Sequence, residues 1–150
     1  MAQPRQSQIQ AITPAREACE LLYSLMVSGP PVFPRVAAEF DLTPPQLHLL
    51  RLLGEGQSMP MRVVAEMLFC DASNVTSLVD RLEERKLIKR RPDPSDRRVK
   101  QIVLTKSGEA LRTKALRKLY EPPAELSALS AADQRALRDI LKRAVSLKEA

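Results

Sequence analysis

The chain has 150 residues, of which 44% are hydrophobic and 28% are charged, and it carries a formal net charge of +6 at pH 7. This length and balance predict one soluble globular domain with a sizeable core. They exclude a membrane-spanning protein, because no apolar run approaches the roughly 20 residues of a bilayer span, and no cleavable signal pattern opens the chain. We therefore expect a cytoplasmic protein without a membrane partner.

The N-terminal part of the chain is predicted to hold a tail and two helices. Residues 1–11 are Gln-rich and polar, offer little to bury, and are expected to be disordered. A helix follows over residues 14–27, until the Ser-Gly-Pro-Pro run at 28–31 breaks it. Because Pro34 should delay any restart, the second helix is expected only over residues 36–40.

Two further helices are marked by the residues at their ends. Thr43 is a good N-cap and is followed by two prolines, while Gly54 stands just past the end, an ordering typical of helix termini. Ser58 is expected to cap a shorter helix that ends at Leu68. The next two residues, Phe and Cys, are then predicted to form the turn of a helix-turn-helix.

The following helix begins at the N-cap Asp71 and has two distinct sides. Apolar residues recur at i, i+3, i+4 and i+7 and form a stripe that should face the core: Val75, Leu78, Val79 and Leu82. With about 100° between successive residues, Ser73, Ser77, Asp80 and Glu84 lie opposite the stripe. Asn74 and Arg81 lie on one flank and Thr76 on the other, so the start of this surface carries short hydrogen-bonding side chains followed by an arginine. Such side chains suit base edges and phosphates. An ordinary solvated helix face would look the same.

A charged hairpin follows this helix. Residues 87–91 and 99–104 are short runs with β-branched residues, and the Asp-Pro-Ser-Asp sequence at 93–96 between them has turn chemistry. Arg97 and Arg98 come next and so lie at or near the tip. An arginine pair on a protruding turn can enter a narrow minor groove, where the negative potential is enhanced.

Positive charge is concentrated in the same region. Residues 81–100 contain nine Lys or Arg and four Asp or Glu, which is a net +5 of the chain's +6. Phosphate neutralisation with release of counterions is the obvious physical use for such a patch. A helix, a strand, a charged hairpin and a second strand follow one another in a winged helix-turn-helix, a structure that holds DNA.

The C-terminal part of the chain is predicted to be helical. Thr105 is a good N-cap for a helix that reaches about Tyr120 and stops at two prolines. The last helix opens at Ser130 with a variant of the capping box, in which Asp133 replaces Glu or Gln. It carries a strong apolar stripe: Leu137, Ile140, Leu141, Ala144 and Val145. Terminal amphipathic helices of this kind either pack on their own chain, which is the ordinary expectation, or build a dimer.

Two segments of the chain resemble a known family. The run VTSLVDRLEERKLIKRRPDPSDRRVKQIVLTKSG, residues 75–108, is similar to the central motif of the MarR family of bacterial transcriptional regulators, and LTPPQLHLLRLL, residues 42–53, is similar to the segment before it. The resemblance covers roughly residues 10–148. It implies a homodimeric, ligand-responsive repressor or activator that binds double-stranded DNA at a palindromic operator.

The resemblance also implies an architecture that is mainly α with a small β-hairpin wing (α+β). This is a winged helix-turn-helix with N- and C-terminal dimerisation helices. Residues 12–150 would form a single domain, with the dimerisation helices at 12–40 and 106–150 and the DNA-binding lobe at 43–105. The terminal helices of this family intertwine across a two-fold axis, the recognition helix enters the major groove, and the wing enters the minor groove.

Individual positions both follow and depart from the family pattern. By motif position, Arg98 would probe the minor groove, with Arg97 beside it and Asp96 bracing the turn. Ser77 stands where many relatives carry Arg, so one direct base contact is expected to be absent. Lys86 stands where many have Gly, and because a left-handed residue costs Lys more than Gly, we expect this junction to turn differently.

The resemblance further implies an effector site. Members of the family often respond to small anionic aromatic compounds bound between the dimer helices and the DNA-binding lobe. The segments that would line such a cleft carry Tyr23, Phe40, His48 and Arg51. His48 and Arg51 are three residues apart on one helix and share a face, and a cation beside an aromatic wall suits a carboxylate on a ring. Ordinary core aromatics with a surface basic pair are the alternative.

Catalytic and metal-binding functions find little support. His48, the single histidine, has no Ser or Cys at a favourable spacing, and Asp93 and Asp96 are two carboxylates beside two arginines, which indicates a turn. Cys19 and Cys70 lack metal-ligand spacing and are expected to be reduced and buried as small hydrophobic residues. We therefore expect no enzyme activity, no metal and no cofactor.

Two alternatives to an effector-responsive regulator remain open. One is a thiol-based redox-sensing regulator on the same scaffold, with Cys19 near Tyr23 as its sensor. It requires a lowered thiol pKa, and no nearby Lys or His in the sequence favours one. The other is a winged-helix module for protein association, which would be expected to lose its tip arginines. Arg97 and Arg98 argue against it.

Overall fold

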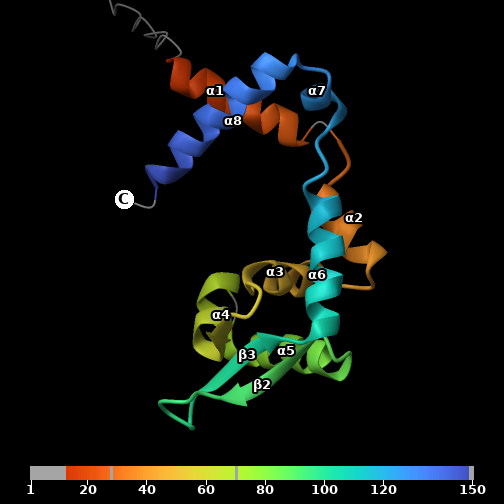
Figure 1. Ribbon diagram of the computed structural model, residues 1–150, viewed down its shortest axis with the longest axis vertical. Helices are drawn as coiled ribbons and strands as arrows, with labels where there is room; N and C mark the ends of the chain where they lie inside the picture. The colour runs from red at the N-terminus through yellow and green to blue at the C-terminus, as the bar shows by residue number, and fades with distance from the viewer. Residues whose placement is uncertain (1–12, 28, 70, 149–150) are drawn as a thin grey trace, which may run out of the picture.

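A computed structural model describes residues 13–27, 29–69 and 71–148, so the tail predicted at 1–11 lies outside the described residues. The described chain is mainly helical with one small antiparallel sheet, which confirms the predicted fold class. Its elements, in chain order (Figure 1), are α1 Pro14–Val27, α2 Val32–Glu39, α3 Pro44–Leu52, β1 Ser58–Pro60, α4 Met61–Leu68, α5 Ala72–Glu84, β2 Ile88–Pro92, β3 Lys100–Leu104, α6 Lys106–Leu119, α7 Ala124–Ser127 and α8 Ala131–Ser146.

The elements form two regions. Figure 1 shows α1, α7 and α8 grouped at one end, and α3, α4, α5 and the sheet at the other, with α6 running between them. We call the first group the terminal helices, and residues 32–119 the winged lobe. Within the described residues, no helix combines the length and the apolar character needed to cross a bilayer.

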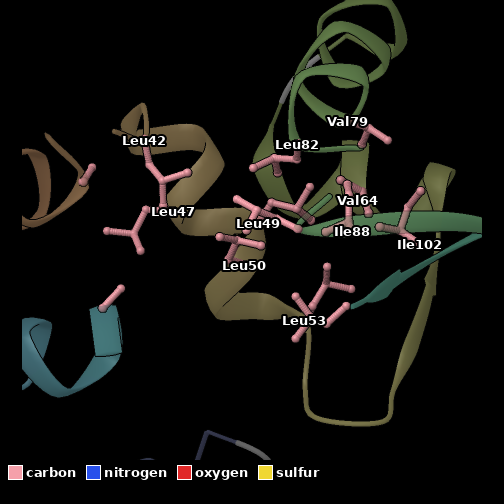
Figure 2. Packing of buried hydrophobic residues seen from close by; sticks show 14 of the residues in the cluster. Leu42, Leu47, Leu49, Leu50, Leu53, Val64, Val79, Leu82, Ile88 and Ile102 are labelled. Carbon is pink, nitrogen blue, oxygen red and sulfur yellow. The ribbon is translucent and has the colours of Figure 1, made fainter. Parts of the chain in front are cut away.

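The core lies in the winged lobe, where α3 packs against α2, α4, α5 and α6. Leu47, Leu49 and Leu50 of α3 are fully buried, as is Leu53 at its C-cap (Figure 2). From α5, the predicted stripe supplies buried Val75, Val79 and Leu82, with Leu78 half-buried beside them. Burying one such side chain stabilises the fold by about 1.5–3 kcal/mol. The core therefore fixes the rotation of α5 about its axis.

The sheet is antiparallel with strand order β1-β3-β2. Register pairs Ile88 of β2 with Leu104 of β3, and Ser58 of β1 with Val103. Both wing strands thus begin one residue later than predicted, while the predicted helix cap at Ser58 is wrong. Ser58 instead opens β1, and α4 starts only at Met61, because β3 offers this segment a hydrogen-bonding edge that local sequence does not reveal.

Two predictions about backbone geometry were also wrong. The second helix begins at Val32 and includes Pro34, since the first amide groups of a helix have no partner within it and a proline there loses nothing. Lys86 takes a left-handed conformation with φ 58°, the one in which glycine is favoured. Its N–H donates to the carbonyl of Glu83 at 2.8 Å, and Leu87 N–H donates to that of Leu82 at 3.0 Å, so the helix end stabilises the turn.

The helix caps predicted for α3, α6 and α8 are confirmed. Thr43 accepts from Gln46 N–H, and the Gln46 side chain accepts from Thr43 N–H at 2.8 Å, which completes a capping box. Thr105 accepts from Gly108 N–H at 3.0 Å, and Ser130 accepts from Asp133 N–H at 3.1 Å. These bonds fix where α6 leaves the sheet and where α8 begins.

The terminal helices bury no side chain within their own chain. The predicted stripe of α8 is present, yet Ile140, Leu141 and Val145 are exposed. Cys19 of α1 is exposed too, so the prediction that it is buried was wrong for the single chain. Cys70 lies outside the described residues.

Candidate nucleic-acid interface

The polar side of α5 faces solvent. The five residues predicted to contact DNA from this helix are all exposed: Ser73, Asn74, Thr76, Ser77 and Arg81. Their orientation follows from the core, because the buried stripe on the other side of α5 leaves the helix a single way to turn. Asp71 is the N-cap residue as predicted, but its side chain makes no capping hydrogen bond.

A hollow of about 310 Å³ lies beside this polar side. Asn74, Ser77 and Arg81 line it from α5, while Thr43 and Pro45 line it from the start of α3. Sequence reasoning missed the contribution of α3, because nothing local indicates that its first turn packs next to α5. The arrangement places a guanidinium, an amide and hydroxyl groups around one concave surface, a set that hydrogen-bonds to phosphates and base edges.

The turn of the wing is held by its own carboxylates. Asp93 accepts from the N–H of Ser95 at 2.7 Å and of Asp96 at 3.3 Å, and from the side chains of Ser95 and Gln101. The hydroxyl of Ser95 and the amide of Gln101, in that order, lower the pKa of Asp93 to about 2. Asp96 accepts from Arg98 N–H at 3.0 Å.

The two tip arginines are therefore presented on a structured turn. Arg97 and Arg98 are both exposed, and neither side chain forms an ion pair within the described residues. Because the turn is already ordered, little backbone entropy remains to be lost when the arginines meet a ligand. The tip of the wing can deliver two positive charges into a narrow space.

Arg90 ties the wing to α5, a role that sequence reasoning missed. Its guanidinium pairs with Asp80 at 2.5 Å and with Glu83, while its N–H donates to Glu83 at 2.8 Å. Burial opposes its charged form, but the hydrogen bonds that Arg90 donates to Asp80 and Glu83 outweigh burial and raise the pKa of Arg90. The pairing also neutralises two acids of α5.

Most of the remaining basic side chains in residues 81–100 are exposed to solvent. Arg85 is held internally by donating to the carbonyls of Phe40 and Asp41. The others form no ion pair in the part of the chain that the structure describes: Arg81, Lys86, Lys89, Arg91, Arg97, Arg98 and Lys100. The charge excess seen in the sequence is thus available to an anionic partner.

A second candidate site is a cavity of about 490 Å³ between α2, α3 and the end of α6. His48 and Arg51 line it together with Phe33, Leu119 and Tyr120. The guanidinium of Arg51 donates from Nη2 to Nε2 of His48 at 3.0 Å, and the Phe33 ring meets the imidazole edge-on with centroids 6.1 Å apart. Since an arginine cannot accept, His48 carries its proton on Nδ1 in this arrangement.

The charges in this cavity are unbalanced. Burial, and then the charge of Arg51, lower the pKa of His48, so the imidazole is neutral at pH 7. Arg51 forms no ion pair within the described residues, and its Nε is buried without a hydrogen-bond partner there. A half-buried cation with an unused donor beside aromatic rings is suited to an anion that carries an apolar body.

The structure separates the four predicted effector residues. His48 and Arg51 share the cavity, whereas Phe40 lines a neighbouring hollow of about 680 Å³ with the basic residues of α6. Tyr23, 69% exposed on α1, lines neither of these two. Tyr120 borders both hollows and was missed, because only the fold brings the end of α6 next to α3. Over the described ranges, no group of three or more His, Cys, Asp or Glu could hold a metal ion.

Comparison with known proteins adds independent information. The model of the MarR family matches residues 42–100, from the start of α3 into the wing. The HTH-type transcriptional regulator YsmB of Bacillus subtilis (strain 168) is 32% identical over 83 residues, 55% of this chain and 57% of that protein. The organic hydroperoxide resistance transcriptional regulator of the same organism is 29% identical over 100 residues, 67% of this chain and 68% of that protein. The matches thus span between about half and two thirds of these relatives.

The fold likeness extends over most of the chain. The crystal structure of the transcriptional regulator Tm0710 from Thermotoga maritima superposes with a TM-score of 0.68 at 26% identity, covering 90% of this chain and 93% of that one. The likeness therefore includes the terminal helices as well as the winged lobe. The segment from α3 into the wing, residues 42–100, thus matches the MarR family, and the fold of the chain resembles that of a transcriptional regulator over most of its length.

Proposed function

We propose that this chain is a sequence-specific DNA-binding transcriptional regulator whose homodimer binds a palindromic operator. One observation carries the proposal. The exposed polar side of α5 lies in the same lobe as the wing, whose turn is ordered by hydrogen bonds and carries two arginines without an ion pair in the described residues. Arg90 links the wing to α5 through Asp80 and Glu83. A module for protein association would have no use for that combination of charge and turn geometry.

The two elements have different roles in this proposal. The start of α5 enters the major groove, where Asn74 can bond to an adenine edge and Arg81 to a guanine or a phosphate, with Ser73, Thr76 and Ser77 around them. Arg98, with Arg97 beside it, enters the minor groove and contacts phosphates, which positions the lobe without reading sequence. The segment 43–105 is thus the DNA-binding part.

The terminal helices bind the second copy of the chain. The exposed stripe of α8 continues into an apolar groove of about 830 Å³ along α7 and α8, lined among others by Leu126, Leu137 and Val145. Exposed Leu22 and Met26, four residues apart on one face of α1, offer a second apolar surface. Residues 12–40 and 106–150 then build a two-fold dimer, which sets two α5 helices against two half-sites.

Binding to genomic DNA fragments at several salt concentrations tests this function. The affinity should fall steeply with salt, because several phosphates exchange counterions for arginine and lysine. Arg98→Ala should weaken binding by similar factors across related operators. Asn74→Ala should relax the preference at one base pair and cost about 1–3 kcal/mol on the best site. Arg135→Ala, at an exposed position on α8, serves as the control. A salt-independent complex, or full affinity in Arg98→Ala, would contradict the proposal.

We further propose that the protein is a repressor and that a small anionic aromatic effector releases it from its operator. The observation that supports it is the cavity of His48 and Arg51, with its uncompensated cation and its aromatic wall of Phe33 and Tyr120. The carboxylate would pair with Arg51, while the ring would lie between the aromatic side chains. Such a ligand must prefer a dimer geometry that misaligns the two α5 helices, since equal affinity for both geometries shifts nothing.

Operator release by a panel of aromatic acids tests the effector site. The parent protein should be released by at least one acid, and Arg51→Ala should lose that response while it still binds the operator. Arg35→Ala removes an exposed arginine from the neighbouring helix α2 and should respond as the parent does. Equal release in the parent and Arg51→Ala, or no release in the parent by any acid, would reject the site.

A redox-sensing regulator is a second candidate, favoured by the exposure of Cys19 on α1. One relative is named for organic hydroperoxide resistance, which agrees with this alternative. Peroxide should then oxidise Cys19 and release the operator, and Cys19→Ser should abolish the release. Thiol titration with and without peroxide measures the first step. An unchanged thiol count after peroxide treatment would remove this candidate.

A further inference from the structure

Among the large hydrophobic residues of the described chain, Phe69 is the most exposed, with 96% of its surface accessible to solvent. It caps the end of α4 in a left-handed conformation with φ 50°, where glycine would be favoured. Its N–H donates to the carbonyls of Ala65 and Glu66, so the direction of the side chain is set by the end of the helix. Both the exposure and the backbone conformation are unfavourable for phenylalanine in an isolated lobe.

Other exposed hydrophobic residues have simpler explanations. Most of them lie on the terminal helices or at the end of α6, where a second copy would cover them. In the described part of the winged lobe, the large ones besides Phe69 are between 37% and 41% exposed: Val32, Met67 and Val99. Phe69 is therefore exceptional, and the helix that it caps, α4, lies at the opposite end of the molecule from α1, α7 and α8 (Figure 1).

Its place in the fold indicates what covers it. Phe69 follows the last residue of α4 and precedes the start of α5, five positions before Asn74. In a helix-turn-helix on DNA, the first helix crosses the sugar–phosphate backbone and the N-terminal residues of the second contact base edges. The turn that joins them is consequently held between backbone and bases, at the edge of the major groove.

The chemistry of the ring restricts the contact further. A phenyl group donates no hydrogen bond to a phosphate, so its gain must come from apolar surface. In the major groove, the C5-methyl group of thymine is the apolar group that distinguishes bases, and phenylalanine is among the side chains that contact it. The deoxyribose next to it offers further apolar surface.

We propose that Phe69 is a further DNA-contacting residue, whose ring packs on the C5-methyl group of a thymine and sets a preference for thymine at one position of each half-site. The inference rests on the proposed DNA-binding function and adds a residue that hydrogen-bonding logic does not find. The left-handed cap then has a purpose, because it directs the ring outward next to the start of α5.

Deoxyuridine substitution tests the contact, since it removes only the methyl group of thymine. Each thymine of a retained operator is replaced in turn, and binding is measured for the parent, Phe69→Ala and Met67→Ala. In the parent, replacing one particular thymine of each half-site by deoxyuridine should weaken operator binding about fourfold. Phe69→Ala should bind the unmodified operator roughly tenfold more weakly and be insensitive to that substitution. Met67→Ala, on the same helix, should keep the parental sensitivity.

A second variant separates binding from folding. Phe69→Gly should be more stable than the parent, because glycine accepts the left-handed conformation, and yet bind the operator more weakly. A purely structural role would move both quantities in the same direction. Losses that are the same in the parent and Phe69→Ala at every thymine, or parental affinity in Phe69→Ala, would overturn the contact. Unchanged DNA affinity with lost regulation in a transcription assay would assign Phe69 to a protein partner instead. Failure of the parent to bind any DNA contradicts the proposed function and is seen before any variant is compared.

Discussion

The winged lobe and the terminal helices differ in whether their apolar side chains are covered within the chain. Every hydrophobic residue that the described chain buries lies between Val36 and Ala115, within the lobe. The terminal helices α1 and α8 also carry apolar side chains, but α1, α7 and α8 bury none of their residues. A stripe on an amphipathic helix stabilises the fold only when something covers it. The lobe is therefore complete as one chain, whereas the terminal helices require a partner.

The largest effect is expected from breaking the surface that we assign to the partner. Leu141→Asp puts a charge into the stripe of α8 and should leave a monomer, as measured by sedimentation. Because two linked half-sites gain avidity, operator affinity should fall by about 10²- to 10⁴-fold. Thermal unfolding of the lobe should stay cooperative, since its core contains no residue of α8.

Arg135→Ala provides the control on the opposite side of α8 and should remain dimeric. If Leu141→Asp were dimeric with full operator affinity, the partner surface would have to lie elsewhere. If instead it unfolded the whole chain, the lobe would not be complete by itself.

The next effect sharpens the claim that the lobe is tightly closed. A Cβ added at Gly108 would lie 1.8 Å from the backbone oxygen of Leu87, which cannot move without shifting the start of β2. Gly108→Ala should therefore destabilise the lobe by about 3 kcal/mol in urea unfolding. Gly29→Ala has nothing within 4 Å and should change stability by less than about 0.5 kcal/mol. Equal effects at both glycines would contradict the packing of α6 on the sheet.

A smaller effect concerns the link between wing and α5. Arg90→Ala removes the ion pairs with Asp80 and Glu83, whose side chains are partly exposed and screened by solvent. The expected loss in free energy of unfolding is about 1 kcal/mol. Arg91→Ala, one residue along the same strand and without an acid partner in the described chain, should lose less than half of that. The same loss in both variants would show that Arg90 contributes only as an exposed side chain.

The smallest effect is confined to the turn of the wing. The folded state lowers the pKa of Asp93 from an ordinary 3.8 to about 2, so its hydrogen bonds are intact above pH 4 and are lost as the pH falls through about 2. The amide signal of Ser95 in NMR spectra should report this transition. Asp93→Asn should lack it. An identical acid transition in both proteins would assign it to another group.

Local sequence was sufficient for the elements that local physics determines. Thr43, Thr105 and Ser130 mark helix starts because a side-chain oxygen next to free amide groups acts within three residues. The strand β1 was missed because its partner, β3, comes some 40 residues later in the chain. Lys86 was missed because the ends of α5 and β2 impose its conformation against the preference of the side chain.

The candidate site divides along the same line. The exposed face of α5 and the tip of the wing could be predicted, because helix periodicity and turn chemistry are local. The cavity around Arg51 could be predicted only in part, since Phe33 and Tyr120 reach it from α2 and the end of α6. Arg90 was counted in the basic patch of residues 81–100, although the fold uses its charge to hold α5. Residues whose role depends on a distant neighbour carry no local signal.

The central claim is that the terminal helices form a dimer, which places two self-contained winged lobes on one operator. Hydroxyl-radical footprinting of a retained operator fragment tests this claim most directly. We predict two protected half-sites related by a dyad and about one helical turn apart, with minor-groove protection where each wing tip lies. In Leu141→Asp, this paired pattern should disappear at concentrations that saturate the parent. A single protected segment without a dyad in the parent, or an unchanged paired footprint in Leu141→Asp, would contradict the account.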